Sequence, residues 1–476
     1  MTLHPINQWR IPKETEDVAR ASFPKGNVYM KMYDSLGILY SDEDFRDLFP
    51  VKCGKSAISP ARLALVTIMQ FMEGLTDRQA ANAVRSRIDW KYLLGLNLTD
   101  CGFDSSVLTQ FRQRLCEHQL ANQLLDKMLA KFDEHNLINK RGKQRTDSTR
   151  VVAGIRLCNR LELVGETLRA ALNEIASLAP QWLKRIISDD WFDRYSYRID
   201  DYRLPKKKTE RYEMALLIGS DGHYLLHKIW FGSDTPAILK QLKSVEVLRN
   251  VWIQQYTFIQ DELTWRNSDK IGLPPNSICI ESPYDIDARN GTKRNTNWTG
   301  YNVHLTETCD EDTPNLITNV ETTTAIVPDG NMTLAIHDKL ADKGLLPKEH
   351  YVDAAYVDSY KLTESYQKHQ INIVGSVAVD YSWQARSNMG FDVASFIIDW
   401  DKKQAICPQG HFSKSWCSTI DCRKSPIIQI KFDRKICADC PVRNNCTKSK
   451  KSPRIIKIRP QAEYDFLTTR RIEQQT

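Results

Sequence analysis

Two aspartates, Asp147 and Asp353, are the residues of this sequence whose surroundings best suit chemistry. Asp147 lies in the β-branched segment 145–153, a composition that predicts a strand. Asp353 ends the short apolar segment 350–353, and small residues suited to a turn follow it. Two carboxylates held together by a sheet form a site for divalent metal ions. The alternative for each aspartate is an ordinary role in capping a turn or a helix.

A second group of residues with metal-binding chemistry lies further along the chain. Six of the twelve cysteines fall within forty residues, namely Cys407, Cys417, Cys422, Cys437, Cys440 and Cys446. In a reducing compartment, this clustering favours metal over disulfides. Cys437 and Cys440 are spaced as a two-ligand knuckle, and Cys407 and Cys446 would complete a tetrahedral site for structural zinc. Cys417, Cys422 and His411 are substitute ligands, and the alternative is a set of reduced, partly buried thiols.

Positive charge is concentrated in the same region. The formal net charge of the 476 residues is +7, but residues 402–459 carry fifteen Lys and Arg against three Asp and Glu, a local charge of +12. The remainder of the chain therefore sums to about −5. A basic module on a mildly acidic chain is typical of a protein that binds polyphosphates, and the alternative is a solvated basic surface.

Length and composition predict a folded, soluble protein of about three domains, since 41% of the 476 residues are hydrophobic. The first residues lack a basic segment followed by an apolar one, which argues against a secretion signal. No apolar run approaches the roughly 20 residues that a membrane span needs. We therefore expect a cytoplasmic protein without a membrane partner.

Helical signals dominate the first third of the chain, after an N-terminal arm with short helices near 14–21 and 42–48. Residues 61–73 are apolar nearly all round, with Pro60 suited to the first turn and Gly74 ending the helix. A capping box at 76–79 then begins a second helix, and a third starts near 105–106. This arrangement resembles a helix-turn-helix, for which plain scaffolding is the alternative. The predicted DNA contacts on the second helix are Arg78, Arg85, Arg87 and Lys91.

The elements that must position the two aspartates follow from the order of patterns after residue 145. A helical insertion is expected at about 155–275; its segment 214–231 could also form a hairpin, but we favour helices. Alternating segments at 300–307 and 316–323 predict an antiparallel pair, followed by a helix at 331–343 and a strand at 349–353. If that last strand lies parallel beside the first, Asp147 and Asp353 become neighbours.

This order of elements, with an aspartate on the first and fourth strands, resembles the ribonuclease-H-like core of DDE transposases. The amino-acid sequence is also similar to those of bacterial insertion-sequence transposases over almost the entire chain. The similar segments include 63–115, 159–166, 282–285, 298–309 and 350–353. The resemblance implies an α/β fold with a ribonuclease-H-like mixed sheet. The expected parts are an arm (1–58), a helical DNA-binding domain (59–138), a catalytic core (139–400) with its helical insertion, a cysteine-rich basic insertion (401–450) and the start of a C-terminal core segment (451–476).

The resemblance also implies the chemistry. Asp147 and Asp353 would be the first two members of a catalytic triad that holds Mg²⁺ or Mn²⁺ and cleaves and joins DNA strands. The implied partners are double-stranded DNA, as transposon ends and target, and further copies of the chain, because two ends must be held together. Asp285 and Asp287 are rival acids, but they precede the strand pair. The cysteine-rich segment would be a zinc-ordered insertion that contacts DNA.

The third acid of the family pattern is expected shortly after a segment that resembles residues 470–476. Glu463 and Glu473 are the acids of the right type nearby, and both lie upstream of that position. The sequence therefore predicts a truncated chain that binds DNA but does not cut or join it at a useful rate. Two alternatives are a catalytically inactive remnant that interferes with intact transposase, and a metal-dependent nuclease unrelated to transposition.

Overall fold

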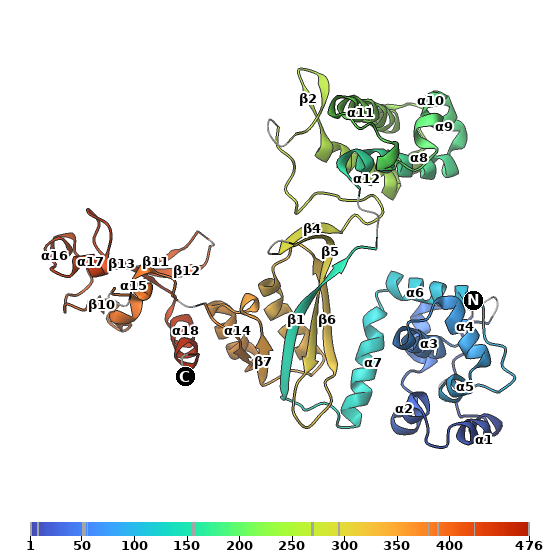
Figure 1. The fold of residues 1–476 in the computed structure, drawn as a ribbon, viewed down its shortest axis with the longest axis horizontal. Coiled ribbons are helices and arrows are strands. Elements are labelled where there is room, and N and C mark those ends of the chain that lie inside the picture. The colour runs from blue at the N-terminus through green and yellow to red at the C-terminus, as the bar shows by residue number, and fades with distance from the viewer. Residues whose placement is uncertain are drawn as a thin grey trace.

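A mixed sheet stands between a helical N-terminal domain, a helical lobe and a cysteine-rich lobe (Figure 1). The structure is a computed structural model, and it describes residues 2–6, 9–49, 54, 56–154, 158–267, 271–293, 296–378, 380–387, 390–422 and 424–474. None of the helices within these ranges is long and apolar enough to cross a membrane.

The N-terminal domain is built from helices whose caps are visible in the sequence. Its elements are α1 (Lys13–Ser22), α2 (Val28–Leu36), η1 (Asp42–Leu48), α3 (Pro60–Glu73), α4 (Asp77–Ser86), α5 (Ile88–Leu94), α6 (Ser106–Glu117) and α7 (Ala121–Glu134). Gly74 ends α3 in the left-handed conformation at φ 64°, and Thr76 begins α4 in a capping box with Gln79, as predicted. Trp9 and Tyr40 share one buried core with the α3 side chains.

The sheet has the order β4-β5-β1-β7-β8, with β6 also paired to β5. Its strands are β1 (Lys143–Val152), β4 (Arg289–Lys293), β5 (Thr296–Thr308), β6 (Ile317–Thr324), β7 (Glu349–Val352) and β8 (Asn372–Val374). β5 runs antiparallel to β1 and β6, whereas β7 runs parallel to β1. The predicted parallel pairing of the segment that carries Asp147 with the segment 349–353 is therefore confirmed.

Helices on the sheet bury its inner side chains. They are η4 (Asp329–Met332), α13 (Thr333–Asp342), η5 (Ala354–Tyr356), α14 (Ser359–His369) and α18 (Gln461–Glu473). Ile336 and Leu340 of α13 form one core with Leu129 of α7, which joins the N-terminal domain to the sheet. The last helix, α18, packs on α14, where the ring centroids of Tyr366 and Phe466 are 5.4 Å apart.

The chain between β1 and β4 forms a lobe with its own hydrophobic core, which we call the helical lobe (residues 158–265). It contains α8 (Arg160–Leu178), α9 (Pro180–Ile186), α10 (Asp190–Tyr195), η2 (Asp201–Arg203), α11 (Lys208–Phe231), η3 (Ala237–Gln241), α12 (Lys243–Gln255), β2 (Tyr256–Ile259) and β3 (Glu262–Trp265). The preference for helices over a hairpin at 214–231 is confirmed, but α11 is one continuous helix where two were expected. A hairpin does occur, but later, because β2 and β3 pair antiparallel.

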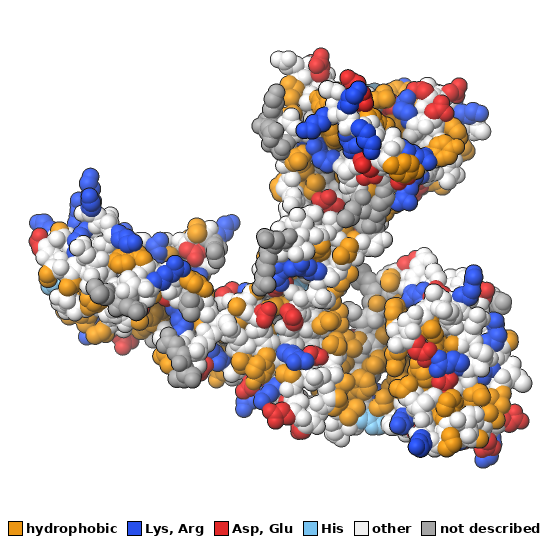
Figure 2. Space-filling view, in the orientation of Figure 1, with side chains coloured by type: hydrophobic (Ala, Val, Ile, Leu, Met, Phe, Trp, Pro, Cys, Tyr) orange, Lys and Arg blue, Asp and Glu red, His pale blue; other side chains and the backbone are white. Residues whose placement is uncertain are grey.

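The cysteine-rich lobe has small sheets around Phe396, Ile430, Phe432 and Ile456. Its elements are α15 (Trp383–Arg386), η6 (Val393–Ser395), β9 (Ile397–Asp399), β10 (Gln404–Ile406), β11 (Ser415–Ile420), β12 (Pro426–Lys431), α16 (Arg434–Ala438), α17 (Arg443–Cys446) and β13 (Ile455–Ile458). β9 pairs with β10 and β13 pairs with β12, so the lobe extends beyond the expected range 401–450 on both sides. Figure 2 shows Lys and Arg side chains over the visible face of this lobe.

Candidate active site

Asp147 and Asp353 each follow directly the last paired residue of two neighbouring parallel strands. β1 and β7 pair with Thr146 opposite Val352, and the next residue on each segment is the aspartate. Asp147 continues β1, whereas Asp353 follows the end of β7 and precedes η5. Both are exposed and line one open cleft. The topology thus brings together two acids that are far apart in the sequence.

The other polar residues of this cleft leave the two aspartates without a cation partner. Arg145 lies opposite Glu307 on β5, and its Nε donates a hydrogen bond of 2.6 Å to the Glu307 carboxylate. Gln474, next to the end of α18, lines the same cleft. Within the described residues, neither Asp147 nor Asp353 forms an ion pair. Both carboxylates are therefore accessible to a bound cation.

A chain of buried polar side chains lies beneath the strands that carry the acids. Thr146 on β1 is 2.7 Å from His350 Nε2 on β7, and His350 Nδ1 is 2.7 Å from His337 Nε2 on α13. Burial lowers the pKa of His337 to about 4 and holds the pKa of His350 well below its usual range. Both imidazoles are therefore neutral near pH 7, and their hydrogen bonds tie β1, β7 and α13 together.

Tyr356 joins the turn after Asp353 to the strands on the other side. Its buried hydroxyl is 2.6 Å from His304 Nδ1 on β5 and is hydrogen-bonded to Ser148, the residue after Asp147. Burial raises the pKa of Tyr356, and the negative charges of nearby carboxylates, Asp147 and Asp353 among them, raise it further. The hydrogen bond with Ser148 lowers this pKa, but its effect is smaller than that of burial. The phenol thus stays protonated and fixes the turn. Sequence reasoning missed it, although its place three residues after Asp353 was a usable signal.

The rival and substitute acids lie outside the residues that line this cleft. Asp285 accepts hydrogen bonds from the Tyr301 hydroxyl at 2.6 Å and from a backbone N–H, so it orders a turn. Asp287 follows it in the same turn region. Glu463 is buried and accepts from Ser359 Oγ at 2.7 Å, and Glu473 is paired with an arginine of its own helix.

The predicted DNA-contacting residues of the N-terminal domain differ in their accessibility. Arg78 and Arg85 are exposed, and Arg85 donates a hydrogen bond to a backbone carbonyl. Arg87 is held by Glu73 and Asp89 at 2.6 and 2.7 Å. Their availability for DNA stays a prediction.

The expectation that Lys91 is available on the polar side of the second helix is wrong. Its side chain is 3% exposed and donates to the carbonyls of Leu98 and Asp100 at 2.6 and 2.8 Å. The physical reason is a break in the predicted helix, because α4 ends at Ser86 and α5 begins at Ile88. The new direction of the chain turns Lys91 into the domain.

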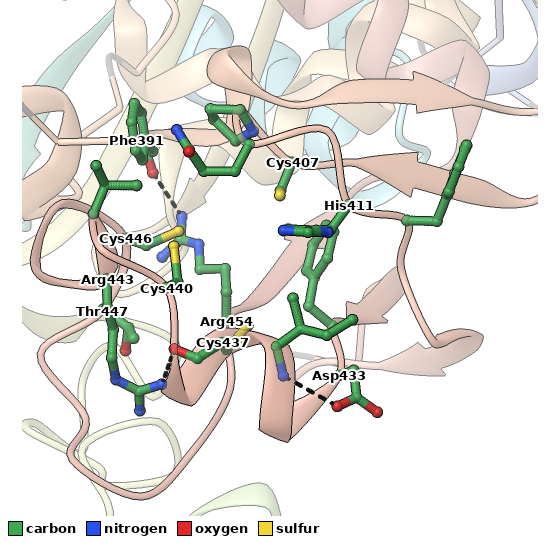
Figure 3. Close-up of a pocket in the computed structure, with 16 residues that line it drawn as sticks. Phe391, Cys407, His411, Asp433, Cys437, Cys440, Arg443, Cys446, Thr447 and Arg454 are labelled. Atoms are coloured by element: carbon green, nitrogen blue, oxygen red, sulfur yellow. Dashed lines mark hydrogen bonds between the residues drawn. The ribbon is translucent and has the colours of Figure 1, made fainter.

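Cys407, Cys437, Cys440 and Cys446 line one pocket, together with His411. Figure 3 shows Cys407 on one side of it and Cys440 and Cys446 on the other. Burial raises the pKa of Cys446 to about 11, and the other three thiols act in the same direction. Among the described residues, no three His, Cys, Asp or Glu side chains are arranged to hold a metal ion. Zinc at this pocket therefore stays a prediction.

The two substitute cysteines, Cys417 and Cys422, are exposed and do not line the pocket. Cys417 lies on β11, in the hairpin that β11 forms with β12. The pocket therefore brings together the four cysteines of the preferred set and His411, and leaves these two outside.

Comparison with known proteins adds two family matches. Residues 17–114 match the family described as a transposase domain (DUF772), and residues 406–476 match the family described as a transposase DDE domain. No curated protein and no solved structure shows significant similarity to the chain. These two matches support an insertion-sequence transposase of the DDE type. Transposases of this type depend on divalent metal ions and bind DNA. Neither matched segment contains Asp147 or Asp353.

Proposed function

We propose that this transposase binds transposon-end DNA and catalyses strand cleavage and transfer at the cleft that Asp147 and Asp353 line. The observation that supports the proposal is the register of β1 and β7, in which Thr146 lies opposite Val352 and each is followed directly by an aspartate. Their oxygen ligands, free of ion pairs among the described residues, suit Mg²⁺ or Mn²⁺. Bound divalent ions would supply activation of the attacking oxygen and stabilisation of the leaving oxygen.

The residues around the acids would hold them in place for that chemistry. Tyr356 and the Thr146–His350 contact fix the two strand ends from below, so that the carboxylates need no large rearrangement on binding ions. Arg145, two residues before Asp147, lines the same cleft. Its guanidinium would release the Glu307 carboxylate and bind a DNA phosphate in its place. The strand order supports a ribonuclease-H-like core, with the helical and cysteine-rich lobes as insertions.

DNA contacts outside the cleft would come from two further regions. Arg78 and Arg85 are exposed on the helix that follows the α3–α4 turn, the position expected for a recognition helix. The basic segment 402–459 would attract phosphates without regard to sequence, and such binding weakens steeply with salt. We also propose that copies of the chain associate, because two transposon ends must be held together.

The cysteine-rich lobe would be ordered by one zinc ion. Four thiols around one pocket form the donor set of a closed structural site, with Cys407 before the β11–β12 hairpin and the other three after it. Without a cation, burial keeps the Cys446 thiol protonated, since its pKa is raised to about 11. A bound zinc would favour the thiolates and draw the pocket closed, which would position the basic residues beside it.

The proposal is tested by nicking of supercoiled plasmid and by strand joining with the full chain in Mg²⁺ and in Mn²⁺. Asp147→Asn and Asp353→Asn should each reduce the rate by orders of magnitude, because charge stabilisation and positioning supply most of this catalysis. Asp285→Asn is the matched control and should retain the rate. Equal activity in all four proteins would refute the assignment, and nicking without any joined product would favour a nuclease.

A further inference from the structure

The helical lobe presents an unusual group of exposed aromatic side chains. Phe192, Tyr197 and Tyr202 are 71%, 68% and 69% exposed and lie within eleven residues of each other along the chain. The segment that contains them runs from α10 through η2 to the start of α11. Large rings with about seven-tenths of their surface in water are costly to keep exposed, so a cluster of them marks an interaction surface.

Cations are interleaved with these rings. The Arg203 guanidinium lies 5.8 Å from the ring centroid of Tyr197 and 5.4 Å from that of Tyr202, and its Nε donates to the Tyr202 hydroxyl. Lys206 and Lys208 follow, both exposed. Arg203, Lys206 and Lys208 have no ion pair within the described part of the chain, so this surface carries uncompensated positive charge.

Three other cations of this segment are paired with acidic side chains, which lowers the net positive charge of the surface. Arg198 pairs with Asp200 at 3.8 Å, Lys207 with Glu210 at 3.0 Å, and Arg211 with Asp201 at 3.1 Å. These three pairs belong to the fold of the segment. The free cations are therefore those nearest the exposed tyrosine rings and those at the entry to α11.

The segment is held in shape by α8. Ile199 and Leu204 are buried in the core of the lobe, on either side of the exposed Tyr202. The backbone N–H of Ile199 donates to Glu166 at 2.6 Å, and that of Asp201 donates to Glu162 at 2.8 Å. The rings are thus displayed from an ordered platform, which lowers the entropy lost when a ligand binds.

We propose that Tyr197, Tyr202 and Arg203 form a stacking platform for unpaired DNA bases, with Lys206 and Lys208 on the adjoining phosphates. This inference rests on the proposed function, because it assigns a strand-handling role to the same enzyme. Exposed rings offer π-faces to bases of any sequence, and cations beside them contact the backbone. Bases inside an intact duplex are already stacked on each other, so the platform favours unpaired bases, such as those exposed when strands are separated.

The test measures equilibrium binding of the full chain, carrying Asp147→Asn to prevent cleavage, to two labelled DNAs. One is a plain duplex, and the other is the same duplex with three unpaired nucleotides that include 2-aminopurine. We expect tighter binding of the second DNA, with quenching of the 2-aminopurine. Tyr197→Ala together with Tyr202→Ala should remove about tenfold of that preference, and Lys206→Gln with Lys208→Gln should weaken it and flatten its salt dependence.

Matched controls are Phe231→Ala, an aromatic residue 77% exposed at the end of α11, and Lys240→Gln, an exposed lysine elsewhere in the lobe. Neither should change the preference. Duplex binding that persists without any preference for unpaired bases, or a preference that survives the tyrosine substitutions, would overturn the platform and leave the proposed function standing. A chain that binds neither DNA would overturn both.

Discussion

The buried histidine pair predicts that the sheet loses stability in mildly acidic solution. His337 binds a proton at its ordinary pKa of 6.5 when unfolded, but its pKa in the folded chain is about 4. The unfolded state therefore takes up more protons as the pH falls, and the stability that neutral His337 contributes is lost between about pH 6.5 and pH 4. Between pH 7 and pH 5 the loss is about 2 kcal/mol, and His350 shifts stability in the same direction.

The measurement is hydrogen exchange followed by mass spectrometry of peptides that cover β1, β7 and α13. After correction for the intrinsic rate, exchange in these peptides should be roughly twentyfold faster at pH 5 than at pH 7 because of His337 alone. His337→Gln should be less stable at pH 7 and should lose about 2 kcal/mol less on acidification. His223→Gln, at an exposed position of the helical lobe, is the control. An identical pH response in wild type and His337→Gln would refute the reasoning.

Three further predictions concern the cysteine-rich lobe, the helical lobe and the N-terminal domain. Purified chain should contain about one zinc ion, which Cys437→Ser should lose and Cys417→Ser should retain; elemental analysis showing no zinc in the wild type would refute the site. Gly222→Ala should destabilise the helical lobe by about 1–3 kcal/mol, because the new Cβ would lie 2.0 Å from Trp252 and the gain of about 1 kcal/mol in helix propensity is smaller. A raised unfolding temperature would contradict this. Arg85→Gln should weaken duplex binding and lower its salt slope by about 1, and an unchanged slope would exclude a phosphate contact.

Local signals in the sequence predicted those parts of the fold that local chemistry determines. Pro60, Gly74 and Thr76 marked helix ends because each is suited to a single position in a helix terminus. Alternation predicted the antiparallel strand pair, whereas the parallel pairing of the segments that carry Asp147 and Asp353 was a hypothesis that the resemblance to DDE transposases supported.

Long-range contacts determined the parts that could not be predicted. Lys91 faces the core because α4 breaks at Arg87, and nothing in the local pattern marks that break. Trp9 joins the N-terminal core across more than fifty residues of chain, for which its own segment gives no periodic signal. The hydrogen bonds of Tyr356 and His350 depend on strands that meet only in the folded sheet. Residues 50–53, near the end of the predicted arm, lie outside the described residues.

The most direct test of the acid pair is metal-directed cleavage of the polypeptide itself. Fe²⁺ replaces Mg²⁺ at oxygen-ligand sites, and with ascorbate and peroxide it generates radicals that cut the chain beside the bound ion. A shared metal site predicts fragments from cuts near both Asp147 and Asp353, suppressed by excess Mg²⁺ and absent in Asp147→Asn. Cuts near only one of the two aspartates, or a pattern unchanged in Asp147→Asn, would contradict a shared metal site.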